Sequence, residues 1–388
     1  MRTPAGPASA TDPYRISSLI ERRDGAQIPV VARRAAGPDP RPAARRRKRI
    51  MAKTDVELAV PVRRDPWITR DKVVHLLQTK GLLIAFALFL VAFSLASDRF
   101  ASVDNISTVL RQVAIVGTIA VGVTIVVIGG NLDLSVGSLL SFSTVLVVDL
   151  HDKIGPGPAI LIMFAAALAV GCVNGLLVGF ARLNSLIVTL GMLSAIQGLT
   201  LIYSGGQNVD IADQEGTWFA FFGRDFLLGV AVPTWIFLGL AVILHVVLTR
   251  TTFGRKVFAV GGNPTAAAFS GVRRARVVFS TYLISAFCTA CAAVILGSRV
   301  MGSQNNVGQG YELVVLAGVI LGGTSLLGGS GSIPKTVVGV LILGFIQNGL
   351  LLLGYPYYAQ WLVTWVVIIL AVWLDVASKR GRLFTTTS

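Results

Sequence analysis

The chain has 388 residues, of which 54% are apolar and only 14% carry a charge, and its mean hydropathy is +0.73. This composition excludes an ordinary soluble domain and indicates a protein that crosses a membrane many times. The formal net charge of +15 comes from 34 Lys and Arg against 19 Asp and Glu. These basic residues lie mainly in the N-terminal segment and in joints between apolar runs, which argues against nucleic acid as a partner.

Residues 1–79 differ from the rest of the chain, because they are rich in Arg, Ala, Pro and Gly and include the run 45–49, Arg-Arg-Arg-Lys-Arg. Such a composition predicts a disordered, basic cytoplasmic extension. Two interpretations of residues 1–50 are open. They form a polybasic stretch that binds anionic membrane lipid, or they are upstream sequence that is not translated in the cell. We favour the second, since Met51 opens a more ordinary leader.

From Gly81 onward, long apolar runs alternate with short polar joints. With its ends included, each run has the ~17–25 residues that a helix needs to cross the hydrocarbon. Backbone amides find no water inside lipid, so these runs must be helical. The runs are residues 81–97, 113–128, 134–148, 159–180, 186–204, 226–248, 278–297, 313–327, 337–353 and 361–374. We therefore predict an all-α, polytopic membrane domain over residues 80–378, with about ten transmembrane helices, and a tail over residues 379–388.

The charges in the joints predict the orientation of these helices. With a cytoplasmic N-terminus, the joint 249–276 lies inside and carries Arg and Lys but no acid. The outer joints then carry most of the acids: Asp98, Asp104, Asp149, Asp152, Asp210, Asp213, Glu215, Asp225 and Glu312. This arrangement satisfies the positive-inside rule and predicts that both termini, including the tail, are cytoplasmic.

The sequence offers no candidate for catalysis or metal binding. The histidines are scattered, and Cys288 and Cys291 lack the further ligands that a zinc site requires. We therefore expect a protein that is not an enzyme and binds no cofactor of its own. The carboxylates Asp133, Asp149, Glu312 and Asp375 all lie at the ends of predicted spans. Ion-coupled transporters place such groups inside the membrane, so this pattern argues against ion-driven transport.

Two glycine-rich segments are candidates for the path of a solute. Residues 129–138 read G-G-N-L-D-L-S-V-G-S, and residues 322–331 read G-G-T-S-L-L-G-G-S-G. In the first, either Asp133 or Ser135 caps the next helix, or unwound backbone lines a polar path. The second is expected to form a tight turn on the inner side. The candidate pathway residues are Gly130, Asn131, Asp133, Ser135, Gly323 and Thr324.

A third glycine pattern, Gly171, Gly175 and Gly179, is spaced at four-residue intervals in the fourth run. This spacing places the three glycines on one stripe of a helix, where another helix can approach closely. We expect a packing role.

The inner joint 249–276 contains a short helix according to its capping residues. Asn263 suits the N-cap, Pro264 the first helical position and Gly271 the stop after a helix over residues 265–270. We expect its small residues to face outward. Taken alone, the pattern fits equally well a helix that docks into a groove on a partner and one that lies on the membrane through Phe269 and the neighbouring arginines.

At these segments the chain resembles the permease subunits of the ribose/xylose type of sugar ABC importer. The resemblance covers roughly residues 80–379 and is carried by several motifs in the family order. These motifs are G-G-N-L-D-L-S-V-G-S-L-L, N-S-L-I-V-T-L-G-M-L, T-x-F-G-R-K-V-x-A-V-G-G-N-P-x-A-A-x-x-S-G-V, G-x-G-Y-E-L and L-A-G-V-I-L-G-G-T-S-L-x-G-G-x-G.

The resemblance implies a multi-pass permease of the bacterial plasma membrane that works as a homodimer or with a similar second permease. A cytoplasmic ATPase with two nucleotide sites would use ATP and Mg, and an extracytoplasmic binding protein would deliver a monosaccharide. Alternating access would then move the sugar inward. Two alternatives stay open: a related permease for another small solute, such as a cyclitol, a nucleoside or a signalling sugar, and an ion-driven secondary transporter.

The resemblance also assigns roles to two joints. It implies that the inner joint carries the coupling helix, which contacts the ATPase. With this resemblance we favour a helix that docks into a partner over one that lies on the membrane. The corresponding residues are Gly261, Gly262, Asn263, Pro264, Ala266, Ala267, Ser270 and Gly271. Thr265 and Ala268 depart from the acid and the Arg that are frequent in the family at these positions. On the outer side, Asp210, Asp213 and Glu215 are expected either to face the binding protein or to belong to a solvated loop.

Overall fold

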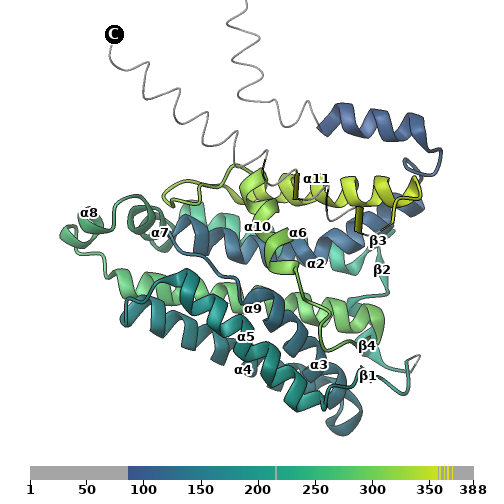
Figure 1. Ribbon diagram of the computed structural model, residues 1–388, viewed down its shortest axis with the longest axis horizontal. Helices are drawn as coiled ribbons and strands as arrows, with labels where there is room; N and C mark the ends of the chain where they lie inside the picture. The colour runs from purple at the N-terminus through teal and green to yellow at the C-terminus, as the bar shows by residue number, and fades with distance from the viewer. Residues whose placement is uncertain are drawn as a thin grey trace, which may run out of the picture. The chain divides into compact units, whose positions relative to one another are not determined.

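The computed structural model describes residues 86–214 and 216–356, together with residues 358, 359, 362, 365, 366 and 369 (Figure 1). The predictions for residues 1–79, for the tail and for most of the tenth run lie outside this part. The described chain is mainly helical, as predicted, and six helices are long and apolar enough to cross a membrane. These are α2 (Val103–Ile128), α4 with η1 (Pro156–Phe180), α5 (Ser185–Ser204), α6 (Val232–Arg250), α9 (Arg274–Val300) and α11 (Ile333–Leu352). The count of about ten spans and the orientation of the termini stay predictions.

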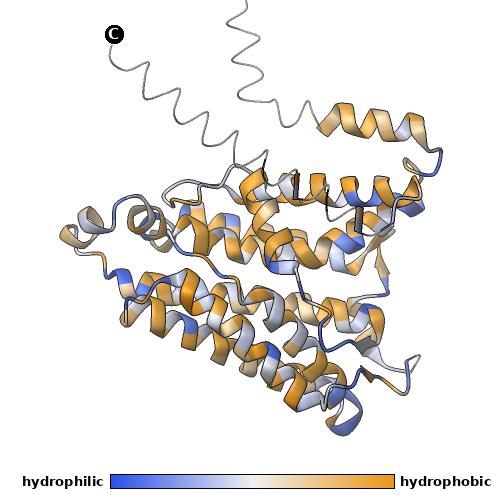
Figure 2. Ribbon diagram, in the orientation of Figure 1, coloured by the Kyte–Doolittle hydropathy of each residue, from blue (hydrophilic) through white to orange (hydrophobic). Residues whose placement is uncertain are grey.

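Helices α2 and α9 lie at the centre of the bundle. Nearly every residue of α2 from Val113 to Ile128 is buried, as expected of a helix that is apolar on all sides. Helix α9 packs against α2, α4 and α3 (Val136–Ile154). In contrast, α4, α5 and α6 expose large apolar side chains, including Leu161, Ile187 and Val242. Polar residues concentrate at the helix ends and in the joints (Figure 2), so these apolar faces suit contact with lipid or with another membrane helix.

The glycine stripe of the fourth run packs against α9, as predicted. A Cβ atom on Gly171 would lie 2.6 Å from the Cβ of Ala286, and one on Gly179 would lie 2.7 Å from the carbonyl oxygen of Ala275. Ordinary side chains therefore cannot replace these glycines without separating the two helices. The run ends in a single π-helical turn, η1 (Leu176–Phe180).

Helix α2 begins at Val103 rather than at residue 113, and two other predicted spans are shorter than expected. Helix α6 starts at Val232 rather than at residue 226, because β2 (Phe226–Leu227) and β3 (Val230–Ala231) form a hairpin before it. Helix α10 (Tyr311–Leu321) ends well before residue 327. It has 11 residues, and because an α-helix rises only about 1.5 Å per residue, it is too short to cross a bilayer. It stops where Gly322 packs against the backbone of Lys335, which leaves no room for a side chain.

The remaining elements gather at the two ends of the helices. Helices α7 (Thr252–Gly262) and α8 (Pro264–Phe269) lie at one end, and the four short strands lie at the other (Figure 1). At the strand end, β1 (Val209–Asp210) pairs antiparallel with β4 (Gly302–Ser303). The 3₁₀ helix η2 (Trp218–Phe222) belongs to the same loop region as β1.

Candidate coupling surface and translocation segments

The short helix predicted in the inner joint is α8, and its capping geometry is the predicted one. The side-chain oxygen of Asn263 accepts a hydrogen bond from the backbone N–H of Ala266 at 2.9 Å, and Pro264 is the first helical residue. Gly271 follows the helix with φ +79°, a conformation that favours glycine. Local sequence signals alone therefore place this helix.

The orientation of α8 differs in one respect from the prediction. Ala266 and Ser270 are exposed, and Phe269 is 90% exposed. Ala267, in contrast, is only 5% exposed, so the prediction that it faces outward is wrong. The carbonyl of Ala267 accepts from the N–H of Val272, a backbone bond that closes the C-terminal end of α8. The exposed small residues of this helix are Thr265, Ala266 and Ala268.

Helix α7, which precedes α8, was missed by the sequence analysis. Thr251 caps it, since its hydroxyl accepts from the N–H of Gly254 at 3.3 Å. Val257 and Val260 are buried. A threonine cap followed by apolar residues at 253, 257 and 260 was the available signal, because this spacing marks one helix face. Gly261 and Gly262 therefore belong to the last turn of α7 and precede α8.

Three glycine-rich segments that are distant in the sequence meet at the end of α7. A Cβ on Gly261 would overlap the carbonyl oxygen of Ile128 and lie 2.7 Å from the amide nitrogen of Gly329. That amide donates to the same carbonyl of Ile128 at 2.8 Å. A Cβ on Gly328 would lie 2.7 Å from the Cα of Gly130. We call this contact of the α7 end, the α2 end and the α10–α11 loop the glycine junction.

Beyond the junction, residues 129–135 run without helix between α2 and α3, and a buried carboxylate anchors them. Asp133 accepts hydrogen bonds from the amide and the hydroxyl of Ser135, at 3.2 and 2.6 Å, and from the hydroxyl of Ser285 at 2.8 Å. Asn174 donates to the Ser135 hydroxyl at 2.9 Å, and the Tyr282 hydroxyl donates to the carbonyl of Leu132 at 2.7 Å. We call this group the Asp133 cluster. It attaches the extended segment to α9 and α4.

The Asp133 cluster bears on two predictions, the position of this carboxylate and the capping of α3. Asp133 lies between the end of α2 and the start of α3, as expected, but its partner Ser285 is near the middle of α9, so the carboxylate packs beside the central part of a membrane-crossing helix. Ser135 is the N-cap residue of α3, but its side chain makes no capping hydrogen bond. The carboxylate of Asp133 instead accepts a hydrogen bond from the backbone N–H of Ser135. Sequence reasoning missed this contact because the partners of Asp133 come from distant helices.

The candidate pathway residues divide into two sets. Asn131, Asp133, Ser135 and Thr324 are each at most 6% exposed, so their side chains face the protein interior. Gly130 and Gly323 are exposed and have φ +76° and +78°. A pathway-lining role for these residues stays a prediction. The buried set shapes the backbone on which the exposed glycines sit.

At the strand end, the acidic loop is partly as expected. Asp210 and Asp213 are exposed, and Glu215 lies outside the described residues. Asp213 also accepts from the N–H of Gly216 at 3.0 Å and thus shapes a turn. Exposed acids can attract a basic partner, and Asp210 and Asp213 are both exposed.

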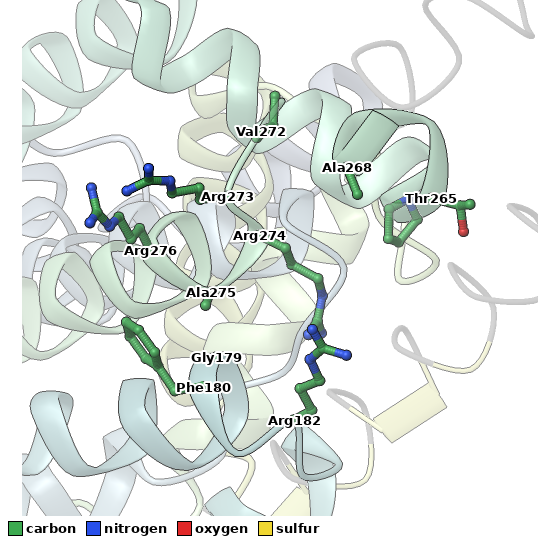
Figure 3. Close-up of a pocket in the computed structure, with 11 residues that line it drawn as sticks. Gly179, Phe180, Arg182, Thr265, Ala268, Val272, Arg273, Arg274, Ala275 and Arg276 are labelled. Carbon is green, nitrogen blue, oxygen red and sulfur yellow. The ribbon is translucent and has the colours of Figure 1, made fainter. Parts of the chain in front are cut away.

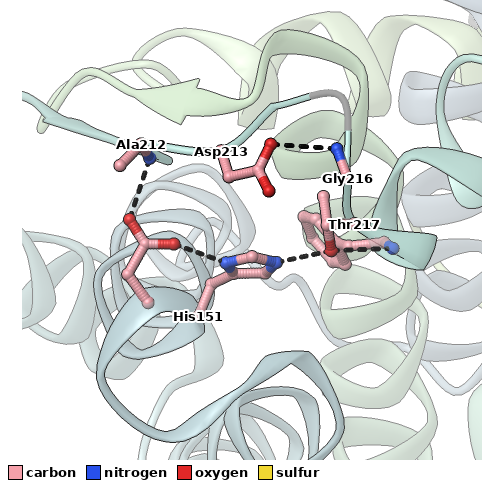
Figure 4. Close-up of polar contacts among 7 residues, drawn as sticks. His151, Ala212, Asp213, Gly216 and Thr217 are labelled. Atoms are coloured by element: carbon pink, nitrogen blue, oxygen red, sulfur yellow. Dashed lines mark hydrogen bonds and ion pairs between the residues drawn. The ribbon is translucent and has the colours of Figure 1, made fainter.

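A histidine that the sequence analysis did not single out attaches this loop to α3 (Figure 4). The ring nitrogens of His151 lie 2.7 Å from a carboxylate oxygen of Asp152 and 2.7 Å from the hydroxyl of Thr217. The other Asp152 oxygen accepts from the N–H of Ala212 at 2.8 Å, and this bond holds the pKa of the Asp152 carboxyl below its usual value. We call these four residues the His151 latch.

Comparison with known proteins identifies the family. The family described as "Branched-chain amino acid transport system / permease component" matches residues 105–372. The ribose import permease of Bacillus subtilis (strain 168) is 38% identical over 312 residues, which cover 79% of this chain and 96% of the relative. The ribose import permease of Escherichia coli (strain K12) is 37% identical over 302 residues, 76% of this chain and 92% of the relative.

An L-arabinose ABC transporter permease of Azospirillum brasilense is 34% identical over 322 residues, 82% of this chain and 93% of the relative. No solved structure matches the chain. The relatives and this chain share nearly the full length of the membrane domain, so the likeness is not confined to a single motif. The chain therefore belongs to this family of transport-system permeases and is a permease of the ribose/xylose-type sugar ABC importers, as its motifs predicted.

Proposed function

We propose that this chain is the membrane-spanning subunit through which an ABC importer moves a pentose-like monosaccharide inward. The observation that carries the proposal is its match to 96% of the length of a ribose import permease. The six apolar helices fit a multi-pass protein of the plasma membrane. The relatives are transport permeases and not enzymes, which supports a role in passage rather than in chemistry.

The proposed partners follow from the two ends of the bundle. A cytoplasmic ATPase with two nucleotide sites would bind α8, whose exposed Ala266 allows close approach of a groove. ATP and Mg would be bound by that ATPase. An extracytoplasmic sugar-binding protein would contact the opposite end, where Asp210 and Asp213 are exposed. A second permease, either a copy of this chain or a similar one, would complete the pore in the membrane.

The glycine junction supports a direct mechanical route from the ATPase to the sugar path. Movement of α8 would pass along α7 to Gly261, which touches the end of α2 through backbone atoms. The extended residues 129–135 begin there and end at the Asp133 cluster on α9. Backbone atoms in direct contact cannot move independently of one another, because close-packed atoms transmit strain. This route would switch the permease between outward-facing and inward-facing states.

Ion-driven transport is the alternative that the structure makes worth testing. The position of Asp133 removes our argument that the membrane interior lacks carboxylates. The alternative is nonetheless disfavoured by family membership and by the coupling helix.

The experiment is reconstitution of the permease in vesicles, with and without its ATPase and binding protein. We expect uptake of labelled ribose or L-arabinose only when both partners and ATP are present. A panel that includes other pentoses, a cyclitol, a nucleoside and a branched-chain amino acid identifies the solute by competition. Uptake by the permease alone, driven by a proton or sodium gradient, would contradict the proposal.

A further inference from the structure

A cavity of about 620 Å³ lies beside the coupling helix, between the end of η1 and the start of α9 (Figure 3). Its charged lining is entirely basic: Arg182, Arg273, Arg274 and Arg276. Pro264 and Thr265 of α8 line the same cavity. The charges and the coupling helix therefore share one space.

Two of these arginines converge on each other. Figure 3 shows the side chains of Arg182 and Arg274, from opposite sides of the cavity, pointing toward one another. In the described part of the chain, the ion pairs involve His151 and Lys153, and no acid pairs with either arginine. Arg182 has φ +59°, a backbone conformation that residues other than glycine rarely adopt. Like charges held together in this way favour a shared anion, and guanidinium groups suit phosphate oxygens.

Part of the cavity wall is apolar. Phe180 lines it and is 53% exposed, together with Val272 and Ala275. The exposed apolar surface continues beyond the cavity, because Leu176 on η1 and Leu183 after it are about half exposed. The cavity thus combines a cationic rim with an apolar wall that leads onto the membrane-facing surface.

We propose that this cavity binds an anionic phospholipid of the inner leaflet. Arg182 and Arg274 hold the phosphate of the headgroup, and an acyl chain lies along Phe180. Basic pockets between helices on the cytoplasmic side are suited to such headgroups. Since α8 forms part of the wall, the bound lipid braces the coupling helix against the first turn of α9. An acidic segment of the ATPase is the competing occupant, but the apolar wall would serve no purpose for it.

The test uses the assembled transporter, which consists of the permease, its ATPase and its binding protein. Native mass spectrometry counts the lipids that remain bound to it. The probe is phosphatidylglycerol, compared with phosphatidylcholine. The double variant Arg182→Gln/Arg274→Gln should bind phosphatidylglycerol more weakly by about fivefold per arginine, roughly 30-fold in total, from the usual contribution of a basic residue at an anionic surface. Its control, Arg250→Gln/Arg255→Gln, removes the same charge from the same end but lines no part of the cavity, and should bind lipid like the unchanged protein.

A second readout is sugar-stimulated ATP hydrolysis in nanodiscs of each lipid. Phosphatidylglycerol should stimulate the unchanged protein and the control but not the cavity variant, whereas Arg182→Lys/Arg274→Lys should recover part of the response. Equal lipid retention by the cavity variant and the control would overturn the proposal. Displacement of the lipid by inorganic phosphate alone would instead assign the site to a free anion. Loss of ATPase association in both lipids would assign the arginines to an acidic segment of the ATPase. The lipid count does not depend on which solute is transported.

Discussion

The two ends of this permease hold distant segments together in opposite ways. At the α8 end, the glycine junction joins α2, α7 and the α10–α11 loop through backbone atoms, as where Gly329 donates to the carbonyl of Ile128. At the strand end, the His151 latch joins α3 to the long loop through side chains, with His151 between Asp152 and Thr217. The first arrangement excludes side chains, and the second depends on them.

This difference predicts how each end responds to change. A backbone contact cannot rotate away from an added atom, so the junction tolerates no Cβ at its closest point. The latch bonds in contrast join side chains, which can rotate to accommodate a small change, and each contributes only about 0.5–1.5 kcal/mol. The latch and its loop should therefore tolerate conservative substitutions better than the junction does. The junction suits the transmission of movement, and the loop suits adjustable contact with a partner.

The largest effect is expected from Gly261→Ala, which tests the junction directly. Its new Cβ would overlap the Ile128 carbonyl, which belongs to the backbone and cannot turn aside. We expect a loss of stability at or above the upper end of the ~1–3 kcal/mol range for overpacking, and loss of uptake. Thermal unfolding of the solubilised permease and a transport assay measure both.

Gly262→Ala is the matched control for this variant, one residue further on. The Cβ there would lie 3.8 Å from the Cα of Gly329, an ordinary contact. This variant should keep near-normal stability and uptake. If both substitutions behave alike, the junction does not have the tight contact described above.

Asp133→Ala should have the next largest effect, since it removes the anchor of the extended segment. The hydroxyls of Ser135 and Ser285 would lose their acceptor inside the protein, and each lost hydrogen bond costs about 0.5–1.5 kcal/mol. Ser285→Ala removes a single bond and should cost less, about 1 kcal/mol. Unfolding measurements rank the variants. An Asp133→Ala protein as stable as the unchanged one would show that the cluster does not anchor the segment.

Gly271→Val should impair coupling more than folding. At φ +79° a side chain costs about 1–2 kcal/mol, and nothing crowds the position otherwise. We expect the α8 stop to shift, so that ATPase association and uptake fall while insertion in the membrane persists.

Ala266→Glu should weaken ATPase association through the exposed face of α8 alone. Pull-down of the ATPase tests both variants, and normal association of the Ala266→Glu protein would contradict the docking of α8. Ala267→Glu cannot serve here, because burial of Ala267 makes it a test of folding.

The smallest effect is expected from Asp210→Asn/Asp213→Asn at the outer loop. Exposed charges mainly tune association rate, so uptake should slow at low salt and approach normal values at high salt. The dependence of uptake on binding-protein concentration, measured over a range of ionic strengths, checks this. Uptake unchanged at every ionic strength would assign the acids to a solvated loop.

The sequence predicted features that depend on local signals. Helix α8 follows from Asn263, Pro264 and Gly271, whose capping roles require no distant partner. The glycine stripe at Gly171 and Gly175 was equally predictable, because helical spacing alone places it on one face. Most apolar runs correspond to helices, since burial of the backbone in lipid allows little else.

Features that arise from packing between distant segments were not predictable in this way. Hydropathy could not show that Phe226 belongs to a hairpin, that α10 ends at Leu321, or that Ala267 turns inward. Nor could a single sequence bring Asp133 to Ser285, because nothing in either residue's neighbourhood specifies the other. The glycine segments were recognised individually, but their meeting at Gly261 required the fold.

The extended segment also has a consequence for the order in which this protein is made. The Ser285 hydroxyl that holds Asp133 follows it by 152 residues. At about 5–20 residues per second, the ribosome completes residues 129–135 on the order of ten seconds before their partner exists. Unpaired backbone cannot rest in lipid during that interval. We therefore expect the segment to remain in a wet or chaperoned environment until α9 has been synthesised and Ser285 can bind Asp133.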